Sequence, residues 1–133
     1  MKRICLAVFL GVFSVGAAEA RTDPCRPEEH APVPRIKGRS YRSIRDKLIA
    51  AGWQPVQTQR SPIDDPDIAE GNGKIFWDKG FVEVEACAVN KTAPCLFLFK
   101  DKQGNKLRVT TLGEELSAEE HYATVNGYYF ICR

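Results

Sequence analysis

The chain has 133 residues, of which 44% are hydrophobic, and its 19 basic and 17 acidic side chains give a formal net charge of +2. This near balance of charge argues against a protein that binds nucleic acid through bulk positive charge. The length fits one domain of ordinary size with a modest hydrophobic core.

The first 20 residues have the three-part layout of a secretory signal peptide. Lys2 and Arg3 precede an apolar run over residues 4–15, and small residues follow as far as Ala20. The apolar run is shorter than a membrane span needs, and no later stretch is long and apolar enough to span a bilayer. We therefore expect cleavage near Ala20, no membrane span in the mature chain and a periplasmic or secreted location.

Cleavage there would leave 17 basic and 16 acidic side chains and four cysteines. An even number of cysteines in an exported chain favours disulfide bonds over metal binding or catalysis. The cysteines form no CxxC pair, so we predict no zinc site, and no other pattern indicates a cofactor. Three connectivities are possible, and the one we prefer joins Cys87 to Cys95 and Cys25 to Cys132.

Residues 21–39 are predicted to form an extended arm that precedes a single α+β domain over residues 40–133. Four prolines exclude a helix in the arm: Pro24, Pro27, Pro32 and Pro34. In the domain, apolar side chains at helical spacing predict a helix over residues 41–51, which begins after Ser40 and ends at Gly52. Residues 53–56 follow as a short strand.

Residues 60–80 are rich in glycine, proline and acidic side chains and predict a solvated loop. The acidic positions do not have the spacing of a calcium-binding loop. Within this region, residues 70–74 are interpreted as a turn. Residues 74–78 are interpreted as a strand or as a lid segment that packs over the sheet.

The densest strand pattern lies in residues 82–88 and 95–100, which predict an antiparallel pair. If Cys87 lies opposite Cys95, every other pair of opposed residues in the two antiparallel strands follows by counting outward from these cysteines. One face is then assigned to the core and holds Val82, Val84, Ala86, Leu96 and Leu98. The opposite face holds Glu83 and Glu85 beside Phe97 and Phe99.

The C-terminal part predicts three further strands. Alternating residues indicate a strand over residues 106–112, and residues 114–120 are predicted to form a helical turn. Asn126 and Gly127 predict a tight turn between strands at 121–125 and 128–132. The predicted architecture is α+β, with one main helix packed on an antiparallel sheet of four to six strands that is stapled by disulfides.

Basic side chains concentrate in residues 35–47, where six of them and one aspartate give a charge of +5 over thirteen residues. A basic patch of this kind can attract anionic glycans, lipid head groups or an acidic protein surface. The alternative is the ordinary charge of a solvated helix face. The candidate binding residues are Arg39, Arg42 and Arg45.

A second candidate surface is the predicted face of Glu83, Glu85, Phe97 and Phe99. Two carboxylates beside aromatic rings could act as acid and base on a sugar, although the same pattern fits an ordinary outward face or a contact surface. No nucleophile motif or phosphate-binding loop accompanies them. His30 and His121 each follow two glutamates, but no helical spacing aims them at one metal ion, so we predict no metal site.

Two resemblances add to these observations. The segment SYRSIRDKLIAAGWQPV, residues 40–56, resembles the helix-then-strand opening of PASTA and beta-lactamase-inhibitor-protein-like modules. Most of the mature chain, with this helix and the C-x7-C spacing of Cys87 and Cys95, resembles small uncharacterised exported proteins of proteobacteria. PASTA modules are associated with peptidoglycan and inhibitor-like modules with enzymes, so the first resemblance implies a binding role.

We therefore expect a non-enzymatic exported protein that binds an envelope protein or an anionic cell-wall component. The alternative is a small envelope hydrolase that acts on glycans through Glu83 and Glu85. A third possibility is a structural or secretion-related subunit.

Overall fold

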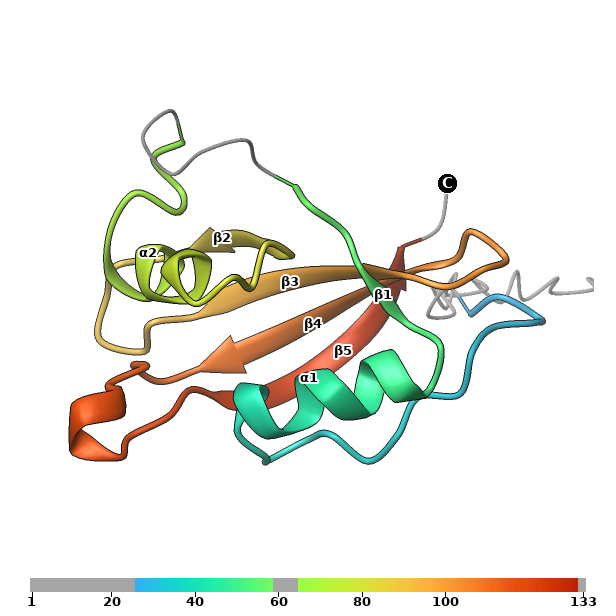
Figure 1. Ribbon diagram of the computed structural model, residues 1–133, viewed down its shortest axis with the longest axis horizontal. Coiled ribbons are helices and arrows are strands. Elements are labelled where there is room, and N and C mark those ends of the chain that lie inside the picture. The colour runs from blue at the N-terminus through green and yellow to red at the C-terminus, as the bar shows by residue number, and fades with distance from the viewer. Residues whose placement is uncertain (1–25, 59–64, 132–133) are drawn as a thin grey trace, which may run out of the picture.

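The computed structural model describes residues 26–58 and 65–131 and has an α+β fold, as the sequence predicts (Figure 1). The predicted signal peptide and the predicted Cys25–Cys132 bond lie outside the described residues. In chain order the elements are α1 (Tyr41–Ala50), β1 (Gln54–Pro55), α2 (Gly71–Asp78), β2 (Val84–Cys87), β3 (Cys95–Lys100), β4 (Lys106–Leu112), the 3-10 turn η1 (Ser117–Glu119) and β5 (Thr124–Ile131).

The sheet has five antiparallel strands organised around β3. The strands β1, β3, β4 and β5 follow one another in that order, and β2 also pairs with β3. Because β4 pairs along the whole of β3, the short strands β1 and β2 share the other edge of β3. The far edge of β5 is covered at Val125, which exchanges backbone hydrogen bonds with Gly38 and Arg39.

Helix α1 confirms the predicted helix and supplies one side of the core. Its residues Tyr41, Ile44 and Leu48 are fully buried, and Figure 1 shows the helix lying across the sheet. The ring of Tyr41 stacks on that of Phe97, with the ring centroids 3.6 Å apart. Gly52 ends this region with a φ of +104°, which explains why a glycine follows the helix.

The predicted face assignment of the β2–β3 pair is confirmed for Val84, which is fully buried in the core, but is wrong for β3. Cys87 faces Cys95 as predicted, but Val84 pairs with Phe97 because the register shifts between Val84 and Ala86. Phe97 and Phe99 are fully buried and share the core face with Cys95, which is 1% exposed. The face with Phe97 and Phe99 is turned toward the core because burial of two aromatic rings removes more apolar area from water than burial of Leu96 and Leu98.

The segment predicted as a turn and then a strand or lid is the helix α2. Its Phe76 is fully buried and packs against the rings of Tyr41, Phe81 and Phe97, so tertiary contacts stabilise this helix. Gly73 lies so close to the preceding loop that an added Cβ would stand 2.6 Å from the Cα of Ile68. Gly73, one of the glycines that suggested a turn, is therefore needed for close packing.

The predicted turn at Asn126 and Gly127 is also wrong, because β5 runs through both residues. Thr110 pairs with Gly127 and Thr111 with Val125, so Asn126 is the extra residue of a β-bulge. The seven residues of β4 are long enough to pair with both halves of β5. The predicted strand over residues 106–112 and the helical turn near residue 117 are confirmed.

Candidate functional site

A pocket of about 460 Å³ opens beside the first two turns of α1. Its walls come from three separate parts of the chain: the start of α1, the segment before β2 and the segment before β5. The lining residues are Ser40, Arg42, Ser43, Arg45, Asp46, Phe81 and Tyr122. Two of the three arginines predicted as binding residues therefore lie together.

Arg45 is held firmly at the base of this pocket. Its Nε donates to Oε1 of Glu83 at 2.6 Å and its Nη2 donates to Oε2 at 3.2 Å. Its guanidinium also lies over the ring of Phe81, 4.7 Å from the centroid. The hydrogen bond to Glu83 raises the pKa of Arg45, whose charge is thus compensated by a buried carboxylate.

Tyr41 completes the environment of Glu83 by donating from its hydroxyl to Oε1 at 2.7 Å. Burial raises the pKa of Tyr41 well above its usual value, and the charge of Glu83 and the hydrogen bond to it raise it further. Tyr41 and Glu83 are both fully buried. This group of side chains fixes α1 to the sheet and leaves no carboxylate oxygen of Glu83 without a hydrogen-bond donor.

Arg42 is the more accessible arginine, with 43% of its side chain exposed. Its guanidinium lies 4.8 Å from the centroid of the Tyr122 ring, and its Nε is 3.9 Å from Oε1 of Glu115. Glu115 is closer to Lys79, whose Nζ donates to Oε1 at 3.1 Å. Arg42 therefore contacts Tyr122 and Glu115 while much of its side chain faces solvent.

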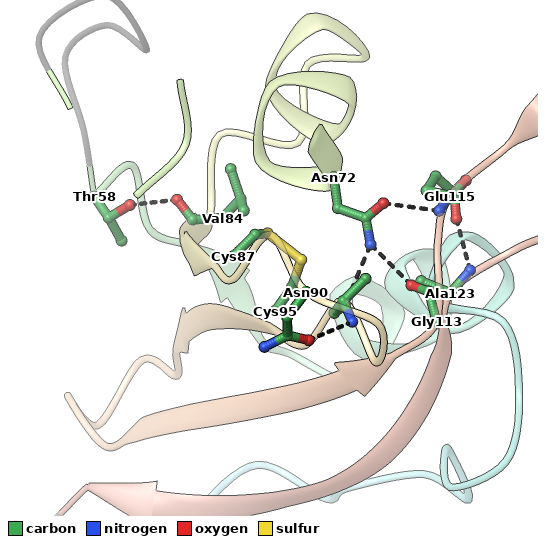
Figure 2. The surroundings of a disulfide bond; sticks show 10 residues. Thr58, Asn72, Val84, Cys87, Asn90, Cys95, Gly113, Glu115 and Ala123 are labelled. Atoms are coloured by element: carbon green, nitrogen blue, oxygen red, sulfur yellow. Dashed lines mark hydrogen bonds between the residues drawn. A yellow bond between two sulfur atoms is a disulfide. The ribbon is translucent and has the colours of Figure 1, made fainter. Parts of the chain in front are cut away.

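A buried polar network supports the wall that carries Tyr122 (Figure 2). Asn72 donates to the carbonyl oxygens of Ala93 and Gly113, and its Oδ1 accepts from the backbone N–H of Glu115 at 2.8 Å. The carboxylate of Glu115 accepts from the N–H of Ala123, the residue after Tyr122. Helix α2 thereby fixes the chain on both sides of η1.

The Cys87–Cys95 disulfide is present, as the sequence predicts, and Figure 2 shows it beside this network. Both cysteines are buried, with 8% and 1% of their surface exposed. The bond joins β2 to β3 on the core side of the sheet. Its position indicates a structural role for these two cysteines.

The remaining predicted site residues do not join the pocket. Arg39 is exposed and is not among the residues that line the pocket. Its backbone carbonyl accepts a hydrogen bond from the backbone N–H of Val125. Phe97 and Phe99 lie in the core and cannot form a binding surface. The burial of Phe97 and Phe99 was not predictable from residues 95–100 alone, because that strand is apolar on both faces.

The predicted pairing of Glu83 and Glu85 on one face is wrong. Glu83 binds α1 through Arg45 on the core side, whereas Glu85 binds Arg108 at 2.6 and 3.0 Å on the opposite side of the sheet. The hydrogen bonds to Glu85 and Tyr129 raise the pKa of Arg108. The register shift beside Glu85 explains why counting along a regular strand put the two carboxylates together.

Ser40, Ser43 and Asp46 were not predicted as binding residues, and neither were the two aromatic residues of the pocket, Phe81 and Tyr122. Each of these two aromatic residues precedes a strand and lies far from α1 in the chain, so no local spacing connects it with the arginines. Among the described residues, no group of three or more His, Cys, Asp or Glu side chains is arranged to hold a metal ion. His30 instead packs against Phe130, with the ring centroids 4.6 Å apart.

Comparisons with protein-family models, curated proteins and solved structures found no match to this chain. Within the described part of the chain, no helix has the length and apolar character needed to cross a membrane.

Proposed function

We propose that this chain is an exported, non-enzymatic binding protein that recognises an anionic group of an envelope component through the pocket beside α1. The observation that carries the proposal is the convergence of Arg42 and Arg45 on one cavity, each with its guanidinium over an aromatic ring. An ordinary solvated helix face would not need aromatic partners from two distant segments.

The two arginines have different roles in this proposal. The charge of Arg45 is compensated by Glu83, so Arg45 shapes the pocket and positions Phe81. Arg42 is half exposed and supplies the positive charge for the ligand. Stacking on Tyr122 limits the rotamers of Arg42 before binding, which reduces the entropy lost when a ligand is bound.

The flanking basic side chains extend this charge outside the pocket. Arg35, Lys37 and Arg39 are all exposed and lie in the segment that leads into α1. Exposed charges outside a binding site increase the rate of association more than the affinity. The pocket would then provide the specific contact.

The alternative function, glycan hydrolysis by Glu83 and Glu85, requires both carboxylates at one substrate. They bind cations on opposite sides of the sheet, and Glu83 is fully buried. The geometry therefore favours binding over this hydrolysis.

The binding proposal is tested by retention on a carboxymethyl-dextran resin at constant ionic strength. Arg42→Gln should weaken binding about tenfold, since a hydrogen bond to a charged group is worth about 1.5–3 kcal/mol. Lys47→Gln is the matched control, because Lys47 is an exposed cation of α1 outside the pocket. Equal retention of the two variants would mean that charge alone drives binding and would exclude the pocket.

A further inference from the structure

Asp46 lies in the same pocket as Arg42, one helical turn further along α1. Residues four apart on a helix have Cβ atoms about 5–6 Å apart, which would permit an ion pair. Arg42 instead lies over Tyr122 and leans toward Glu115. Asp46 is exposed and makes no hydrogen bond or close ion pair with another described residue, although its negative charge acts on the neighbouring Arg45 and helps to raise the pKa of that guanidinium.

The pocket therefore presents a cation and an anion that are both available to a ligand. The hydroxyl of Ser40 is a third polar group, because it makes no capping hydrogen bond to the helix. Phe81 and Tyr122 add aromatic surface to the wall of the same pocket. A suitable ligand needs an acceptor for Arg42, a donor for Asp46 and some apolar surface.

This combination disfavours a phosphate group. A phosphate carries a charge of about −1.5 to −2 at neutral pH and offers mainly acceptor oxygens, so Asp46 would repel it. A carboxylate carries a single charge, and the guanidinium of arginine can bind it through two nitrogens. Hydroxyl groups next to that carboxylate would supply the donors that Asp46 lacks.

We propose that the pocket binds an acidic sugar unit of a glycan, with its carboxylate on Arg42 and a neighbouring hydroxyl donating to Asp46. The inference rests on the proposed function and adds the class of ligand to it. Asp46 then selects for sugar acids, because it accepts from hydroxyls and repels ligands that consist of anionic charge alone.

The test uses the complete mature chain and three probes: tetragalacturonic acid, a neutral galactose tetramer and tripolyphosphate, each titrated and followed by NMR shifts. Wild type should bind tetragalacturonic acid more tightly than either other probe. Asp46→Asn should weaken binding of the acidic sugar about tenfold and strengthen binding of tripolyphosphate. Glu119→Gln, which removes an exposed carboxylate outside the pocket, should change neither affinity.

The outcomes separate this inference from the proposed function. The sugar assignment is overturned if Asp46→Asn tightens binding of both anionic probes, or if wild type prefers tripolyphosphate. In either case Asp46 only repels anions, and the proposal that the pocket binds an anion still stands. If Arg42→Gln binds all three probes as wild type does, the pocket is not the anion site and the proposed function itself fails. Thermal unfolding of each variant would establish that these surface substitutions leave the fold intact.

Discussion

Arg45 and Glu83 form a two-point ion pair that joins α1 to the residue before β2, with Nε and Oε1 2.6 Å apart. The side chain of Glu83 is fully buried, while 18% of that of Arg45 is exposed. The same pair holds the guanidinium of Arg45 over Phe81 in the pocket. Stability and shape of the candidate site therefore depend on one contact.

Removal of Arg45 alone should destabilise the protein strongly. Arg45→Met leaves the carboxylate of Glu83 buried without a cation, and we expect a loss of about 3 kcal/mol in the free energy of unfolding by urea. A triple variant with Tyr41→Phe, Arg45→Met and Glu83→Met removes all three polar side chains of this group. It should lose less stability than Arg45→Met alone. If the triple variant is the less stable of the two, the ion pair contributes net stability and the desolvation argument is wrong.

The helix α2 shows why part of this fold was not predictable from sequence. Helix α1 and strand β4 have clear periodicity over seven or more residues, and both were predicted closely. Helix α2 has eight residues, two of them glycines, and its one fully buried aromatic ring contacts residues far along the chain. Local propensity favours a turn there, and only tertiary packing makes the helix stable.

Gly73→Ala should therefore destabilise the protein, although alanine is the better helix former. The new Cβ would stand 2.6 Å from the Cα of Ile68, a backbone atom, and 3.2 Å from the carbonyl oxygen of Asp67. We expect a loss of about 2 kcal/mol, since overpacking costs more than the gain in helix propensity. Lys74→Ala, at an exposed position of the same helix, is the control and should change the midpoint of thermal unfolding little.

The candidate site could be predicted only in part for a similar reason. The basic run identified Arg42 and Arg45 because their charge is visible in the sequence. Their partners Phe81, Tyr122 and Glu83 come from distant segments, and the register shift in β2 reversed the expected side of Glu83. A one-residue shift turns a side chain to the other face of a sheet, so face assignments fail wherever a bulge occurs.

Thr111 carries a buried hydroxyl with no hydrogen-bond partner in the described structure. Thr111→Val replaces this hydroxyl with a methyl group of similar size, so we expect unchanged or increased stability, by up to about 1 kcal/mol. Thr110→Val is the matched control on the same strand, because the hydroxyl of Thr110 donates to the carbonyl of Gly127 at 3.2 Å. Urea denaturation in which Thr111→Val loses more stability than Thr110→Val would show that the Thr111 hydroxyl has an essential partner.

The Cys87–Cys95 disulfide closes a short loop, and the chain-entropy model assigns it about 2.5 kcal/mol. The double variant Cys87→Ala and Cys95→Ala should lose approximately this amount in urea denaturation and keep the fold. Non-reducing peptide mapping of the purified protein tests the remaining pair, which we predict to be Cys25–Cys132. Recovery of Cys25 joined to Cys87 would contradict both predicted bonds.

Asp101 fastens the N-terminal arm to the turn between β3 and β4, and this contact should depend on pH. Its Oδ2 accepts from the N–H of Ala31 at 3.0 Å, and Asn105 donates to both carboxylate oxygens from its backbone and side chain. Burial raises the pKa of Asp101, but the hydrogen bonds from Asn105, Ala31 and Gln103 lower it by more, so the net shift is downward. The native state therefore favours the charged form.

Because the native pKa is lowered, Asp101 stabilises the fold above the ordinary aspartate pKa of about 3.9, and this contribution is lost as the pH falls through the native value. Free energies of unfolding measured from pH 7 to pH 2 should fall more steeply for wild type than for Asp101→Asn, which is less stable at pH 7. Asn105→Ala removes one donor and should give an intermediate slope. Identical slopes for wild type and Asp101→Asn would show that this carboxylate does not link the arm to pH, and that acid unfolding begins elsewhere in the protein.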